Sequence, residues 1–143
     1  MGIGHLVLAA FITGIAAAPA LAGTTPSPDG ARVYFVNIED GDNLTNPVLI
    51  QFGLEGMGVA PAGAEGFEHT GHHHLLINEQ LEGEELNEPV PADDQHVHFG
   101  GGQTQVEIEL PPGEHVLQLV LADANHIPHD PPVMSERITV TVK

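Results

Sequence analysis

The chain has 143 residues, a formal net charge of −17, ten histidines and no cysteine. Without cysteine it can form neither disulfides nor thiolate metal sites, so any metal would need imidazole, carboxylate, thioether or backbone ligands. The acidic charge makes nucleic acid and anionic membrane surfaces poor partners and cations good ones, although taken alone it is explained best by solubility.

The first segment reads as a secretory signal peptide. An apolar run over residues 6–18 is shorter than the roughly 20 residues of a membrane span, and it leads into the cleavage-type triplet Ala20-Leu21-Ala22. We therefore expect residues 1–22 to be removed and the product to be periplasmic or extracellular. No stable membrane anchor is expected, because lipidation has no cysteine to use. Residues 23–30 read as a flexible leader, and residues 31–143 as one domain.

Seven segments of β-branched, aromatic or alternating apolar residues then follow, separated by glycine- and proline-rich turns. They are residues 31–38, 47–54, 72–78, 95–99, 103–110, 114–122 and 137–142. Residues 55–71, 79–94 and 123–132 are predicted to be loops. No helical period of useful length occurs after the signal segment. This pattern predicts an all-β fold, an immunoglobulin-like antiparallel sandwich of two sheets and about seven strands.

The loop over residues 79–94 carries seven acidic residues and two prolines. We expect it to be a solvated acidic loop. A calcium site is conceivable there, but the loop lacks the D-x-D-x-D-G spacing of an EF-hand, so the sequence does not favour one.

The histidines are gathered in three groups, and only His5 and His115 stand apart. The groups are His69 with His72, His73 and His74, then His96 with His98, then His126 with His129. In an immunoglobulin-like sandwich these segments map to one end, and Met57 maps there too. Because residues two apart on a strand share a face, His72 pairs with His74 and His96 pairs with His98. The pairs meet if strand 95–99 lies beside strand 72–78, and the sequence leaves that open.

Clustered imidazoles without thiolates suit Cu(II), Zn(II) or Ni(II), and a nearby methionine adds competence for Cu(I). We therefore predict a metal site, with copper favoured over zinc. The predicted ligands are His72, His74, His96 and His98, with His126 and His129 completing or supporting the shell, and with His69, His73 and Met57 as secondary candidates. His115 is expected at the opposite end of the sandwich, as a packed residue without a role in the site.

The chain resembles a family of bacterial exported domains of unknown function. The likeness rests on TGHHHLLIN (70–78), HFGGGQT (98–104) and LPPGEHVLQLVLADANHIPHDPPVMS (110–135), within a stretch from Ala31 to the C-terminus. Residues 111–123 also resemble the sixth strand of bacterial immunoglobulin-like domains, in which the position of His115 tucks its ring against the preceding corner. These resemblances imply a periplasmic β-sandwich and carry no established activity, so function has to be argued from the site.

A weaker likeness links His96-Val97-His98-Phe99-Gly100 to the copper-binding strand of copper–zinc superoxide dismutase. The chain lacks that family's disulfide cysteines, and no zinc loop or active-site arginine motif is evident. Periplasmic copper carriers built on a similar frame, with His and Met ligands, offer an analogy in chemistry only.

Three functions remain open at this point. The first is a non-enzymatic metal-binding domain for buffering or delivery, with a metal ion and another periplasmic metalloprotein as partners. The second is a structural or protein-binding module whose histidines only form hydrogen bonds. The third is a small metalloenzyme that uses an open coordination position. We assign no catalytic residues, because the sequence shows no Ser-His-Asp spacing, paired-carboxylate motif or phosphate loop.

Overall fold

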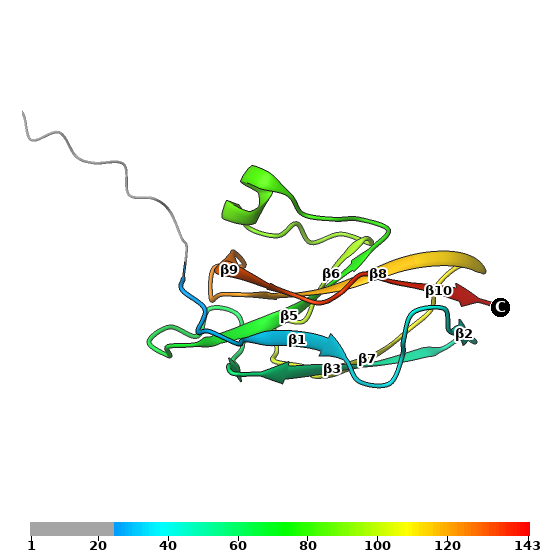
Figure 1. The fold of residues 1–143 in the computed structure, drawn as a ribbon, viewed down its shortest axis with the longest axis horizontal. Coiled ribbons are helices and arrows are strands. Elements are labelled where there is room, and N and C mark those ends of the chain that lie inside the picture. The colour runs from blue at the N-terminus through cyan, green and yellow to red at the C-terminus, as the bar shows by residue number, and fades with distance from the viewer. Residues whose placement is uncertain (1–24) are drawn as a thin grey trace, which may run out of the picture.

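The computed structural model describes residues 25–143, so the predicted signal peptide and its cleavage site lie outside the described residues. Within this range the fold is an all-β sandwich of two stacked sheets, as predicted (Figure 1). None of the helical structure over residues 25–143 is long and apolar enough to cross a membrane.

The smaller sheet contains three antiparallel strands in the order β1-β3-β7. Their bounds are Arg32–Phe35 for β1, Val48–Glu55 for β3 and Gln105–Ile108 for β7. The larger sheet has the order β2-β10-β8-β5-β4, and β6 and β9 pair with β5 and β8 respectively. Its strands are β2 (Asn43–Leu44), β4 (Gly58–Val59), β5 (Thr70–Ile77), β6 (His96–His98), β8 (Gly113–Ala122), β9 (Pro128–Met134) and β10 (Ile138–Val142). All seven predicted strands are present.

The core lies between the two sheets and is built by the alternating inward side chains of both. The larger sheet contributes a leucine row from β8, and the smaller sheet contributes aliphatic and aromatic side chains from β1 and β3. The fully or nearly buried members include Val33, Ile50, Phe52, Leu75, Leu117, Leu119, Leu121 and Val140. Because the chain has no cysteine, this apolar burial is the main source of its stability.

The acidic segment over residues 79–95 covers part of the outer face of the larger sheet. It contains a short 3-10 helix, η1 (Gly83–Asn87), which stands above the sheet in Figure 1. Leu81 and Val90 anchor the segment by packing on Leu76 and Val120 of the sheet. The predicted acidic loop is therefore a layer with an apolar underside, and most of its carboxylates face solvent.

The prediction of a loop over residues 123–132 was wrong for its second half, because Pro128–Met134 forms strand β9. Proline cannot donate to a strand ladder and is tolerated mainly at sheet edges. Strand β9 pairs with β8 through Pro128, Val133 and Met134, with a register shift that leaves the intervening prolines out of the ladder. Residues 25–27, expected to be part of a flexible leader, hydrogen bond to Asp130 of this edge strand.

Candidate metal centre

Strand β5 divides its histidines between the two faces of the larger sheet. His73 points inward with Leu75 and Ile77, and its ring packs against Phe52 with centroids 5.1 Å apart. His72 and His74 therefore lie on the outer face, as strand alternation predicts. Of the three rings, only the two on the outer face can contact histidines from other elements.

Strand β6 lies beside β5, which decides the alternative that the sequence left open. The pairing is antiparallel and places His98 opposite His74 and His96 opposite Leu76. On its other side β5 pairs with β8, so that His72 lies opposite Ala122, at the start of the turn that carries His126. Three separate elements thus deliver histidines to one place on the outer face.

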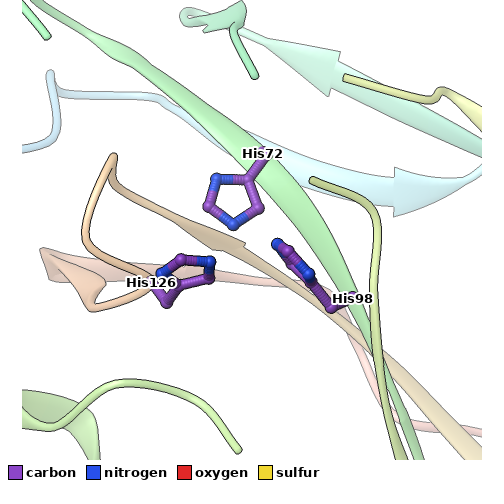
Figure 2. Close-up of side chains that lie close together, drawn as sticks. All are labelled: His72, His98 and His126. Atoms are coloured by element: carbon purple, nitrogen blue, oxygen red, sulfur yellow. The ribbon is translucent and has the colours of Figure 1, made fainter. Parts of the chain in front are cut away.

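These histidines form a compact group, shown in part in Figure 2, in which the rings of His72, His98 and His126 point toward a common space. Their ring centroids are 4.7 to 5.0 Å apart. The ring of His74 lies 4.8 Å from that of His72 and 5.1 Å from that of His98. We call these four residues the His cluster.

The spacing of the ring nitrogens suits a metal ion after small side-chain rotations. One ligand nitrogen from each of His72, His98 and His126 lies within 4.8 Å of the other two. The Nε2 atoms of His72 and His74 are 3.0 Å apart. Two imidazole nitrogens bound tetrahedrally to zinc at 2.0–2.1 Å would be about 3.3 Å apart, so the observed separations bracket that value.

The His cluster leaves several buried nitrogens without partners. Nδ1 of His72, Nδ1 of His74 and Nε2 of His98 are buried and have no hydrogen-bond partner among residues 25–143. A buried polar atom left in this way costs about 1 to 3 kcal/mol. The one contact inside the cluster, between His72 and His74, therefore does not satisfy the group. Unsatisfied polar atoms gathered in one place point to a ligand.

Burial keeps these rings in the neutral form that metals require. It lowers the pKa of His72 to about 4, helped by the neighbouring His98 and His126. It lowers the pKa of His74 to about 3, with His72 and His98 adding to the effect. The pKa of His98 is also lowered, by burial and then by His126. At neutral pH these three imidazoles keep a lone pair free for a metal.

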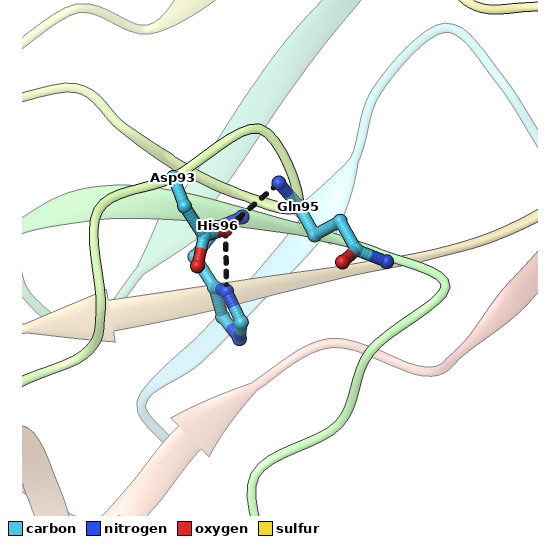
Figure 3. Close-up of polar contacts among 3 residues, drawn as sticks. All are labelled: Asp93, Gln95 and His96. Atoms are coloured by element: carbon cyan, nitrogen blue, oxygen red, sulfur yellow. Dashed lines mark hydrogen bonds and ion pairs between the residues drawn. The ribbon is translucent and has the colours of Figure 1, made fainter.

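The structure does not bring His96 into the His cluster, although the sequence placed it among the ligands. Figure 3 shows its ring bonded to Asp93 near the start of β6, with Nδ1 2.8 Å from Oδ1 of the carboxylate. The hydrogen bond from His96 is the largest cause of the lowered pKa of Asp93. His96 shares the face of β6 with His98, but opposite Leu76 it stands under the acidic segment instead of beside His72.

The remaining candidates lie elsewhere. His129 is buried, with Nδ1 3.3 Å from the carbonyl of Thr25. Its Nε2 abuts Gly71, on the inward side of β5. His69 is exposed with a left-handed backbone (φ 54°), and Met57 packs against the core instead of facing the His cluster.

His115 lies at the end of β8 away from the His cluster, where Nε2 is 2.7 Å from the carbonyl of Pro111 and Nδ1 is 3.1 Å from the side-chain nitrogen Nδ2 of Asn78. Both ring nitrogens are thus hydrogen-bonded, and the ring closes the corner before β8. This is the packed arrangement expected for that position.

Sequence reasoning did not single out Asp123, a buried carboxylate at the end of β8 that holds the turn of His126. The sequence does contain a signal for this role: the turn begins with Asp123-Ala124-Asn125, and Asp side chains commonly accept a hydrogen bond from the backbone amide two residues on.

A family model described as "Domain of unknown function (DUF4399)" matches residues 50–143, which include every member of the His cluster. No curated protein matches the chain, and no solved structure does.

Proposed function

The chain belongs to the DUF4399 family, whose description assigns no activity, and we propose from the His cluster that this protein binds a divalent transition-metal ion for buffering or delivery outside the cytoplasm. The observation that carries the proposal is the convergence of His72, His98 and His126 from three separate elements, with His74 beside them. Such convergence between distant segments is hard to explain by packing alone.

A purely structural role accounts for less of the geometry. Histidines that only tie loops together need hydrogen-bond partners, and the His cluster contains one nitrogen–nitrogen contact and three buried nitrogens without partners in the described part of the chain. A metal ion would accept the lone pairs of the ring nitrogens that converge in the His cluster. It would also offset the cost of burying the rings of His72, His74 and His98.

An all-imidazole set suits Cu(II) and Zn(II), and affinity at nitrogen sites rises to a maximum at Cu(II). We therefore propose Cu(II) as the preferred ion, followed by Zn(II). Met57, the thioether that the sequence suggested for Cu(I), packs against the core and does not support that additional preference. The charge of −17 favours the approach of any cation to the protein.

Four imidazoles would occupy all the positions of a four-coordinate ion, whereas catalytic sites keep a position open for water or substrate. This count favours a carrier or buffer over a metalloenzyme. With the predicted signal peptide, the protein would act in the periplasm or outside the cell and pass its ion to another metalloprotein there.

The test begins with untagged protein recovered from the periplasm, whose metal content is measured by elemental analysis. Affinities for Cu(II) and Zn(II) are then measured against a competing chelator at pH 7.5. His98→Ala should weaken binding tenfold or more, because it removes a ligand at the centre of the His cluster. His96→Ala is the matched control on the same strand face, and it should change affinity less than threefold. Wild-type protein that binds neither ion, or equal losses in the two variants, would refute the proposal.

A further inference from the structure

The carboxylate of Asp123 is buried, and it bonds both the turn that carries His126 and Thr25 near the N-terminus. Its Oδ1 accepts hydrogen bonds from the backbone amides of Asn125 at 2.8 Å and Ile127 at 3.1 Å. Its Oδ2 accepts the hydroxyl of Thr25 at 2.6 Å. Only 4% of the residue is exposed. The side chain therefore closes the five-residue turn 123–127 from inside.

His126 needs such support because its backbone is left-handed, with φ at 69°. A residue with a Cβ rarely adopts this region unless its surroundings hold it there. The amide of His126 donates to the carbonyl of Asp123 at 2.9 Å, and the amide of Asp123 donates to the carbonyl of Ile127 at 2.9 Å. Hydrogen bonds made by both the backbone and the side chain of Asp123 thus hold the turn closed.

Hydrogen bonds from two other segments, at Gly63 and Val90, fix the position of this turn. The amide of Gly63 donates to the carbonyl of Ala124 at 2.9 Å, and the amide of Val90 donates to the carbonyl of His126 at 2.9 Å. His126 is the one member of the His cluster that does not lie on a strand. Its position therefore depends on the turn, and the turn depends on Asp123.

We propose that Asp123 is the positioning residue of the metal centre. It presents His126 to the other three imidazoles by holding the turn 123–127. The inference rests on the proposed function.

The experiment compares Cu(II) affinity, by chelator competition, in two variants with different consequences. Asp123→Ala removes all three acceptor contacts and should weaken binding tenfold or more. Asp123→Asn keeps an acceptor for the two turn amides and can donate to Thr25, so it should hold the turn less firmly than aspartate does and weaken binding by less than Asp123→Ala. Asp93→Ala is the matched control, because Asp93 also bonds turn amides and a histidine, but that histidine is outside the cluster.

A double-mutant cycle with His126→Ala separates positioning from general damage. If Asp123 acts through His126, Asp123→Ala should cause little further loss of affinity in a His126→Ala protein. Electron paramagnetic resonance of bound Cu(II) should report one imidazole fewer in Asp123→Ala, as in His126→Ala, and an unchanged count in Asp123→Asn. If Asp123→Ala does not fold, Asp123→Asn is carried through the same cycle, with a coupled loss expected.

The positioning role of Asp123 and the metal binding of the protein can fail separately. Wild-type protein that binds no metal would remove the proposed function and the inference with it. Wild-type protein that binds Cu(II), while Asp123→Ala keeps wild-type affinity or an unchanged imidazole count, would overturn the positioning role alone. Fully additive losses in the double variant would do the same.

Discussion

His73 gives the most direct test of how the two faces of β5 differ. Its ring is completely buried between the sheets, and neither ring nitrogen has a hydrogen-bond partner within residues 25–143. Replacing it with leucine, a side chain of similar size, removes two unsatisfied polar atoms and keeps the packing against Phe52. The variant His73→Leu should therefore be more stable than the wild type.

The size of the gain depends on pH. At pH 7.5 the ring is neutral in both the folded and the unfolded state, so the gain is the desolvation cost of its nitrogens, about 1 to 3 kcal/mol. Burial lowers the pKa of His73 to about 4, whereas the unfolded chain keeps a value near 6.5. At pH 5 the unfolded wild type therefore binds a proton that the folded protein does not, which adds about 2 kcal/mol to the gain.

The assay is equilibrium unfolding in urea at pH 7.5 and pH 5 with chelator present. Binding of Cu(II) should stay unchanged, because His73 faces away from the His cluster. His115→Leu is the control: both of its ring nitrogens are hydrogen-bonded, so the same substitution should destabilise the protein. A His73→Leu variant less stable than wild type at both pH values would refute the assignment of His73 as an unsatisfied core residue.

Two further outcomes are expected. Metal-free wild type should lose stability as the pH falls from 6.5 toward 4, because the folded pKa values of His72, His73 and His74 lie below the unfolded value. Urea unfolding in a pH series should show the free energy of unfolding falling by up to about 4 kcal/mol per pH unit, and a flat profile would contradict this expectation. Gly100→Ala should weaken Cu(II) binding severalfold in a chelator titration and change the stability of the fold little, because the new Cβ would lie 2.4 Å from Cε1 of His98. The control is Gly101→Ala, whose Cβ meets Gln103, and which should bind Cu(II) normally.

Local sequence pattern determined the fold class and the facing of the histidines. Alternation along a strand is a property of adjacent residues, so the inward direction of Leu75 and Ile77 already implied that His73 turns inward and that His72 and His74 turn outward. Strand β9 was missed for the opposite reason. Its prolines are poor strand formers, and only the edge position beside β8 makes them acceptable.

The composition of the His cluster was decided by tertiary structure. The pair His96 and His98 looks equivalent in sequence, yet the register of β6 on β5 sets His98 beside His74 and leaves His96 opposite Leu76, bonded to Asp93. His126 and His129 likewise look like a pair, but the left-handed turn sends one to the His cluster while the other lies against Gly71 on the opposite side of β5. Register and turn conformation depend on hydrogen bonds between segments far apart in the chain, which residue spacing does not encode.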